Sequence, residues 1–520
     1  MGSAYAESTM VAAEECAAYS CATTIASPHV LLLPLSAQGH VTPLMELAKH
    51  LSARGVEVTF ATEQNIHARL LRSWQSHSLI HLRCIPDLLP SESNQESPDD
   101  PFKALEGGAF ELLRILKSEG RPVTCIVGDF FLGWTSSLAR RASIPDWVFW
   151  PMNASVLTMY LDLQSLMSSG YDPFNEYESI CASRERLHSK TINFVADLPL
   201  GLTIADFPGK TPFGKPLSGW LKEVLMRCFS RLAEAKLGVL CNTTMALEQS
   251  VLQALHSRLQ NGEFRDHTGF IQMIGPLVAN AVADQKTSGT GLWEEEREEC
   301  EEWLDNQPPT SVLYVAFGSL RVLTAPQLQE LLLGLIASGH RFLMVLRPNT
   351  VVSEAHYKSH SHIDAQDTDV VPLEKALPAG FLSRDQQHLY KIVSWAPQSL
   401  VLAHPSIGGF FSHCGWNSTL ESLCCGVPIL GWPWIMDQVT NCRLVSSVWK
   451  VGLLLGCNER GETSRDQVES GVRRLKEGAV ADTLRARARE IRDKMREIIV
   501  NNQPIMRFIE EIEGLSCLRP

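Results

Sequence analysis

The sequence lacks any long hydrophobic run, and no stretch approaches the roughly 20 consecutive apolar residues that span a bilayer. Its N-terminus is rich in alanine and carries Glu7, Glu14 and Glu15, without the basic segment and apolar core of a signal peptide. MGSAYA begins like a myristoylation signal, but Ala6 stands where Ser or Thr is needed. We therefore predict a cytoplasmic protein without membrane insertion, in which residues 1–27 form a disordered tail.

Positive charge and paired cysteine motifs are also scarce. The formal net charge is −12 at pH 7, which argues against nucleic acid as a partner because phosphate backbones bind basic surfaces. None of the 14 cysteines forms a C-x-x-C pair, and Cys125 and Cys241 lie in apolar, strand-like runs. This pattern favours buried free thiols in a reducing compartment over disulfides.

The chain is long enough for two domains of ordinary globular composition, with 520 residues of which 45% are hydrophobic and 20% charged. The chain contains two consecutive series in which strand-like and helical patterns alternate, which predicts two α/β domains with parallel sheets. We place the first domain at residues 28–277, a linker at 278–296 and the second domain at 297–490. The helical segment 491–520 is expected to return to the first domain. Because ligands bind beyond the carboxyl ends of such strands, the site should lie in a cleft between the domains.

The segment with the strongest chemical pattern is residues 395–438, WAPQSLVLAHPSIGGFFSHCGWNSTLESLCCGVPILGWPWIMDQ. The strand IGGFF is followed by a turn at His413 and by a helix that opens with Asn417 and Ser418. Exposed N–H groups and the positive end of the helix dipole are typical of a phosphate site, although Asn and Ser at a helix start are more often only caps. Asp437 and Gln438 follow an aromatic run, a combination that suits sugar hydroxyls.

This segment resembles the C-terminal signature box of plant-type family 1 glycosyltransferases, in length and at nearly all of its defining positions. The resemblance extends to QGHVTPLMELAKHL, EWLDNQPPTSVLYVAFGSL and LPAGFL. It implies the GT-B fold, in which two Rossmann-like domains face each other across a cleft. It also implies an inverting transferase that binds a small lipophilic acceptor on the first domain and a UDP-sugar mainly on the second. Neither a metal nor a cofactor is implied, and the protein is expected to be a monomer.

The resemblance also assigns roles to individual residues of the box. Trp395 would stack on uracil, the Ala396 backbone would pair with the base, and Gln398 and Glu421 would hold the ribose. The groups around the diphosphate would be Ser319, His413, Asn417 and Ser418. The Trp416 region, Asp437 and Gln438 would bind the sugar. Because Trp416 and Gln438 match members that use UDP-glucose, the donor is predicted to be UDP-glucose rather than UDP-galactose or UDP-glucuronate.

The catalytic base is expected from the first domain. His40 lies in SAQGH, between the first strand and its helix, and the resemblance makes it the base that deprotonates the acceptor. Asp129 closes the strand TCIVGD and would orient the imidazole. One position departs from the family pattern: where Ser or Thr often contacts the donor, this chain has Asn153 after Pro151, so Asn153 would have to substitute.

Two metal-like patterns are given little weight. Asp367 and Asp369 match the D-x-D of metal-dependent transferases, and His356, His360 and His362 have loosely metal-like spacing. Both patterns fall in the polar stretch between Asn349 and Lys375, which we expect to be a mobile loop.

Two alternatives remain beside the transferase: a UDP-sugar-binding protein without turnover, and a GT-B hydrolase or epimerase of UDP-sugars. The presence of both His40 and Asp129 disfavours the first. Flavonoids, other phenolics, terpenoids and hormones all remain open as acceptors in secondary metabolism.

Overall fold

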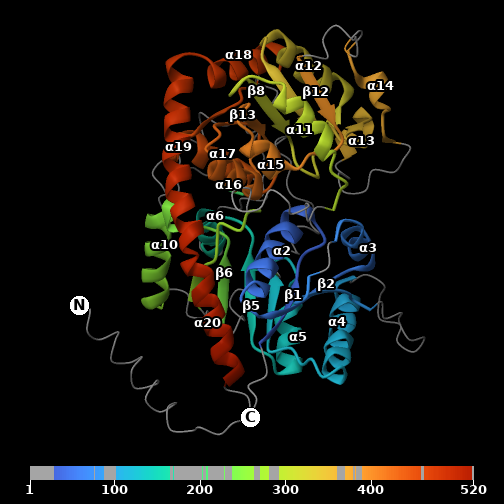
Figure 1. Cartoon of the computed structure of the whole chain (residues 1–520), viewed down its shortest axis with the longest axis vertical. Helices are drawn as coiled ribbons and strands as arrows, with labels where there is room; N and C mark the ends of the chain where they lie inside the picture. Colours follow the sequence, from blue (N-terminus) through green and yellow to red (C-terminus); the bar gives the residue numbers. More distant parts are fainter. Residues whose placement is uncertain are drawn as a thin grey trace.

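Two parallel β-sheets organise the computed structural model (Figure 1), which describes residues 28–74, 77–86, 101–163, 168, 202, 206–208, 228, 237–262, 270–279, 292–359, 369–378, 381, 389–457 and 462–517. The first sheet has the order β3 (Ile80–Cys84), β2 (Glu57–Thr62), β1 (His29–Leu33), β4 (Cys125–Asp129), β5 (Asp146–Trp150), β6 (Gly238–Cys241) and β7 (Phe270–Met273). The second has the order β12 (Tyr390–Val393), β10 (Arg341–Val345), β8 (Val312–Ala316), β13 (Ile407–Ser412), β14 (Ile429–Gly431) and β15 (Gly452–Leu454).

Helices connect these strands. Around the first sheet they are α2 (Gln38–Ser52), α3 (Gln64–Ser73), α4 (Pro101–Ser118), α5 (Thr135–Ala142), α6 (Ala154–Leu161) and α10 (Met245–Gln260). Around the second they are α11 (Arg297–Asp305), α12 (Ala325–Ala337), α13 (Glu354–Ser359), α14 (Leu373–Ala376), α15 (Gln398–Ala403), α16 (Trp416–Cys425), α17 (Gln438–Arg443) and α18 (Arg465–Lys476), with a π-helical turn at Leu444–Val448. Both sheets start from a central strand and add neighbours on either side, which confirms the prediction of two Rossmann-like domains.

The central strands are continuously apolar because helices cover both of their faces. In β1, Val30 and Leu32 join a core shared with α2, whereas Leu31 and Leu33 join a core shared with α4 and α5. This alternation follows from the two-residue period of a strand. The sheet is thereby fixed from both sides, and the ends of its strands become rigid supports for side chains.

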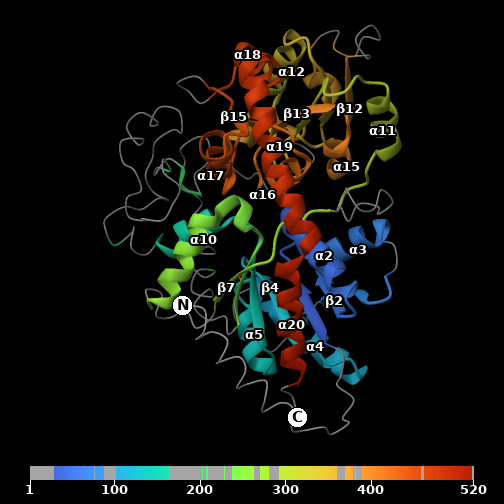
Figure 2. The same cartoon turned by 60° about the vertical axis from the view of Figure 1, so that its left-hand side comes forward.

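The last two helices, α19 (Gly478–Asn501) and α20 (Gln503–Cys517), run along both domains (Figures 1 and 2). α19 packs on α16 of the second domain and on α10 of the first. α20 places Phe508 edge-to-face on Trp147 of β5, with ring centroids 5.7 Å apart. The predicted boundary after residue 490 falls inside α19, and the break in the helix comes only at Asn502, where φ is 47°. The domain limits themselves stay a prediction.

Several sequence expectations differ from the structure. The polar stretch expected as a loop contains the short strand β11 (Val351–Val352), which pairs with β9 (Leu323–Thr324), and the helices α13 and α14. Nine cysteines in the described ranges are free thiols, as predicted, but Cys457 forms a disulfide. Within the described residues, no helix is both long and apolar enough to cross a membrane.

Candidate active site

The end of β4 and the first turn of α2 bring His40 and Asp129 together. Asp129 Oδ2 lies 2.7 Å from His40 Nδ1, and the Asp129 side chain is fully buried whereas that of His40 is 18% exposed. The other carboxylate oxygen, Oδ1, accepts a hydrogen bond of 2.9 Å from the backbone N–H of Phe131. Because Asp129 holds Nδ1, Nε2 is the imidazole nitrogen left to take a proton from a substrate.

His40 was expected in a loop, but it lies inside α2, which begins at Gln38 rather than near Pro43. The helix starts early without a side-chain cap, so its first turn carries no sequence signal of a start. The edge of the Phe131 ring supports the imidazole, with ring centroids 5.3 Å apart. A helix turn and an aromatic ring thus fix the orientation of His40 more firmly than a loop would.

The turn after β13, at the N-terminus of α16, is where the sequence predicts the diphosphate site. His413 fills the space between two glycines: a Cβ atom at Gly318 would lie 2.6 Å from His413 Nε2, and one at Gly415 would lie 2.5 Å away. Gly318 also has a φ of +74°, which residues with side chains rarely adopt. Ser319 follows it in the turn after β8, so the two turns meet at His413. The structure therefore brings together the turns that carry Ser319 and His413, two residues predicted to bind the diphosphate.

The imidazole of His413 is neutral rather than cationic. Loss of hydration on burial and, after it, the charge of Arg321 lower the pKa of His413 to about 3. The imidazole is therefore uncharged at neutral pH, and any positive charge for a diphosphate has to come from elsewhere.

Asn417 links the diphosphate turn to the helix that carries the base. Its Nδ2 donates a hydrogen bond of 2.8 Å to the carbonyl of Gly39, next to His40 in α2. In a regular helix that carbonyl would accept from the residue four positions later, which here is Pro43 and has no N–H. Pro43 therefore leaves the Gly39 carbonyl open to a partner from the other domain. Asn417 Oδ1 is buried without a partner, so it is a vacant acceptor at the site.

The residues predicted for the nucleoside form one connected group. Gln398 Nε2 donates to Ser418 Oγ at 2.9 Å and to Glu421 Oε2 at 2.5 Å, and Ser399 Oγ donates to Glu421 Oε1 at 2.7 Å. Burial raises the pKa of Glu421, which the hydrogen bonds from Gln398 and Ser399 partly offset. These bonds fix the orientation of the carboxylate that is predicted to hold the ribose.

Trp395, the residue predicted to stack on uracil, is not a free aromatic surface in the structure. Trp395 already stacks on Trp293, with centroids 5.6 Å apart and planes at 29°. Next to Trp395, Ala396 is buried. Trp293 therefore occupies one face of the Trp395 ring, and a base could stack only on the other.

The predicted sugar-binding residues lie at the start of α17 and at the N-terminus of α16. Loss of hydration raises the pKa of Asp437 to about 6, against hydrogen bonds from Asn441 and the Trp416 backbone and the charge of His40. The indole of Trp416 is buried and donates to the carbonyl of Asn242 at 2.6 Å, so only its backbone faces Asp437. Gln438 Oε1 accepts from the backbone N–H groups of residues 434 and 435, at 2.9 and 3.2 Å.

Known proteins with the same organisation clarify what this site is. The family model described as UDP-glucoronosyl and UDP-glucosyl transferase matches residues 324–475. UDP-glycosyltransferase 85A7 of Arabidopsis thaliana is 34% identical over 486 residues, which cover 89% of this chain and 91% of that protein. The chain belongs to the UDP-glycosyltransferase family.

Two further relatives of this UDP-glycosyltransferase extend the comparison. The (R)-mandelonitrile beta-glucosyltransferase of Prunus dulcis is 33% identical and covers 89% of this chain and 92% of its own. The structure of Phytolacca americana UGT2 complexed with UDP-2fluoro-glucose and pterostilbene is 25% identical, with a TM-score of 0.71 and coverage of 94% of this chain and 100% of its own. The similarity confirms the predicted GT-B fold.

In this UDP-glycosyltransferase the Asn153 side chain is not available to replace the Ser or Thr with which family members often contact the donor. Its side chain is fully buried: Oδ1 caps α6 by accepting from Val156 N at 2.8 Å, and Nδ2 donates to Asn441 Oδ1 at 2.5 Å. Asn441 in turn donates to Asp437 Oδ2 at 2.7 Å. Asn153 is therefore linked to Asp437, a predicted sugar-binding residue, through Asn441, which no motif in the sequence singles out.

The pKa of Asp437 gives the glycosyltransferase a testable pH dependence. A carboxylate accepts hydrogen bonds from sugar hydroxyls, and Asp437 loses this charge as the pH falls below about 6. We expect the Kd of UDP-glucose to rise up to about tenfold between pH 7 and pH 5, the worth of one charged hydrogen bond. Calorimetry without acceptor measures this, and Asp437→Asn should bind more weakly with a flat profile. Parallel profiles in the two proteins would contradict the assignment.

Of the residues with a metal-like pattern, the structure describes His356 and Asp369. His356 Nδ1 contacts Asp369 Oδ2 at 3.2 Å, which anchors α13, while Asp367, His360 and His362 lie outside the described residues. No three His, Cys, Asp or Glu residues among the described ones form a group that could hold a metal.

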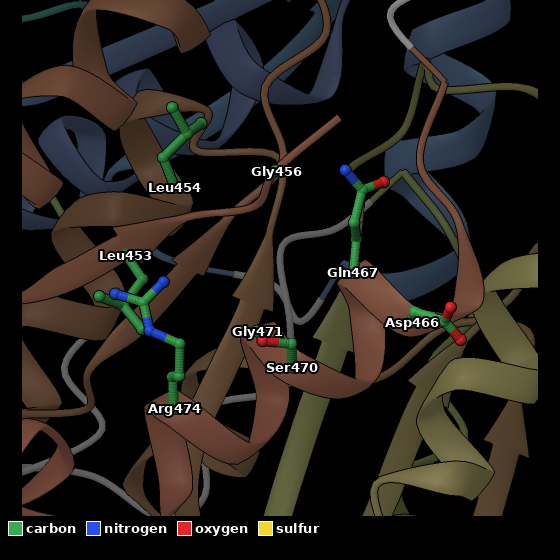
Figure 3. A pocket seen from close by; sticks show the side chains of 8 residues that line it. All are labelled: Leu453, Leu454, Gly456, Asp466, Gln467, Ser470, Gly471 and Arg474. Carbon is green, nitrogen blue, oxygen red and sulfur yellow. The ribbon is translucent and has the colours of Figure 1, made fainter. Parts of the chain in front are cut away.

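A hollow lies at the outer edge of the second sheet (Figure 3), and its lining includes no residue of the turn after β13. It lies between the edge strand β15 and α18, and Gln467 and Arg474 are among its lining residues. Gln467 is already used in the capping box of α18 with Ser464.

Proposed function

We propose that this enzyme transfers glucose from UDP-glucose to a hydroxyl group of a small lipophilic acceptor, with inversion at the anomeric carbon. The observation that supports this most is the pairing of His40 with Asp129 beside the nucleotide turn. The Asn417 bond to Gly39 holds the base next to the donor residues, and His40 is close enough to Asp437 to influence its pKa.

The reaction follows from this placement. The acceptor hydroxyl gives its proton to His40 Nε2 while its oxygen attacks the anomeric carbon. The bond from that carbon to the β-phosphate oxygen breaks, and its electron pair leaves with UDP, through an oxocarbenium-like transition state. Asp129 stabilises the imidazolium that forms, and the α16 N-terminus, Asn417, Ser418, Ser319 and His413 would donate to the diphosphate. Attack opposite the leaving group inverts the centre without a covalent intermediate.

The choice of glucose rests on Trp416 and Gln438, which match family members that use UDP-glucose. The relative from Prunus dulcis is named a glucosyltransferase, and the Phytolacca americana structure holds UDP-2fluoro-glucose together with pterostilbene, an aromatic compound. These support a glucosyl donor and a small, largely apolar acceptor for this chain. We also propose that the protein is cytoplasmic and monomeric.

Mass spectrometry of the purified protein with UDP-glucose and a panel of phenolic, terpenoid and hormone acceptors tests this function. We expect glucosides to form with UDP-glucose in preference to UDP-galactose and UDP-glucuronate, and transfer to survive EDTA because backbone donors stabilise the leaving group. UDP-glucose alone should be nearly inert. Turnover without acceptor would favour a hydrolase or epimerase, donor binding without any turnover a binding protein, and activity restored only by Mn²⁺ a metal-dependent transferase.

A further inference from the structure

Arg321 is a buried cation whose charge the described residues around it compensate only in part. Only 6% of the residue is exposed, and in the described part of the chain it forms no ion pair. Its guanidinium stacks on the ring of Trp432 with Cζ 3.6 Å from the centroid, and Nη1 donates to the Trp432 carbonyl at 2.6 Å. Nε is buried without any hydrogen-bond partner. Burial lowers the pKa of Arg321 to about 10, so the group is still charged at neutral pH.

A charge buried in this way is unfavourable unless an anion or a full set of hydrogen bonds compensates it. The aromatic face of Trp432 and one carbonyl compensate in part, and the unused Nε–H shows that the set is incomplete. In the described part of the chain, the protein therefore holds positive charge at a place where the surrounding residues supply no negative charge.

The position of Arg321 indicates which anion is missing. It follows Ser319 by two residues in the turn after β8, and its charge is close enough to His413 to help lower the pKa of that imidazole. Trp432, on which it stacks, directly follows β14 and bonds back to Ser412 at the end of β13. Arg321 thus lies among the ends of the three strands that carry the diphosphate turn, where His413 supplies no charge.

We infer that Arg321 balances the negative charge of the UDP-sugar diphosphate and of the UDP that departs. The inference rests on the proposed function and adds to it a charge that the signature box itself lacks. When the glycosidic bond breaks, its electron pair stays on the β-phosphate oxygen, and a fixed cation in a site of low dielectric constant stabilises that charge without reorganising. Arg321 acts here through its charge, while the N–H groups of the α16 turn make the directed bonds.

The test separates charge from structure by comparing ligands with and without phosphate. The Kd values of UDP and uridine are measured by calorimetry for wild type, Arg321→Gln, Arg321→Lys and the control Lys375→Met, which removes an exposed cation of the same domain. The ratio of the uridine Kd to the UDP Kd reports the diphosphate contribution. We expect Arg321→Gln to lower this ratio about tenfold or more with the uridine Kd almost unchanged, and Arg321→Lys and Lys375→Met to stay near wild type.

Equal weakening of UDP and uridine in Arg321→Gln would show that Arg321 only supports the turn, and an unchanged ratio would show no role; either result overturns the inference. If Arg321→Gln does not fold, Arg321→Lys decides, because burial lowers the pKa of a lysine. The ratio should then fall between pH 7 and pH 9.5 in Arg321→Lys but not in wild type, and a flat ratio would overturn the inference. A wild type that does not prefer UDP to uridine would instead contradict the proposed donor site.

Discussion

Replacing His40 by alanine is expected to reduce kcat for glucose transfer by about 10²–10⁴-fold, the usual contribution of a general base. The acceptor hydroxyl is not acidic enough to attack unaided, and Nε2 of His40 is the group that the Asp129 bond leaves available for its proton. The Kd of UDP should stay near the wild-type value, because the nucleotide group of Gln398, Ser418 and Glu421 is formed within the second domain.

Steady-state kinetics with the best acceptor, together with calorimetry of UDP, measure both quantities on the same protein. A His40→Ala enzyme with near-normal kcat would show that another group takes the proton. If UDP binding were lost together with kcat, the effect would instead come from the α2 contact to Asn417 and would say nothing about the base.

Asp129→Asn should be nearly as harmful as loss of the base, although the substitution changes only one atom. Asp129 accepts hydrogen bonds from the Phe131 N–H at Oδ1 and from His40 at Oδ2. An asparagine must keep its oxygen toward the Phe131 N–H, since the opposite orientation would place two donors against each other. Its NH₂ group then faces His40 Nδ1, which forces the proton onto Nε2, where it blocks acceptance of the substrate proton. We therefore expect kcat to fall about 10³–10⁴-fold by analogy with the serine protease triad.

Asp146→Asn is the matched control, because Asp146 is a buried aspartate on the adjacent strand, with Ser136 Oγ 2.6 Å from its Oδ2. A hydroxyl can donate or accept, so this site tolerates an amide, and Asp146 lies at the opposite end of β5 from the site. Asp146→Asn should retain kcat. If Asp129→Asn retained kcat as well, control of the His40 tautomer would not be part of the mechanism.

The inner strands of both sheets could be predicted from the sequence because helices cover them on both faces, which makes them continuous apolar runs. β3 and β7 were missed, and both are edge strands of the first sheet. β3 carries His81 and Arg83, half-exposed at the sheet edge, and β7 carries Gln272, so neither reads as an apolar run. Strand patterns in sequence report burial, and edge strands are only partly buried.

The site was predicted where residues match a contiguous motif and was missed where contacts cross between domains. The turn at His413 and the start of α16 followed from local sequence and resemblance. The bond from Asn417 to Gly39, which depends on Pro43, and the chain from Asn153 through Asn441 to Asp437 join residues far apart in sequence. Arg321 was passed over because its significance lies in the absence of a partner, which only the packed structure reveals.

The stereochemistry of the glucoside tests the central claim most directly, since it depends on the base and the leaving UDP lying on opposite sides of the anomeric carbon. Proton NMR of the product that the wild-type enzyme forms from UDP-glucose, an α-linked donor, gives the configuration from the coupling between H1 and H2. Direct attack by a hydroxyl deprotonated by His40 predicts a β-glucoside. An α-glucoside, or free glucose as the sole product, would contradict this account.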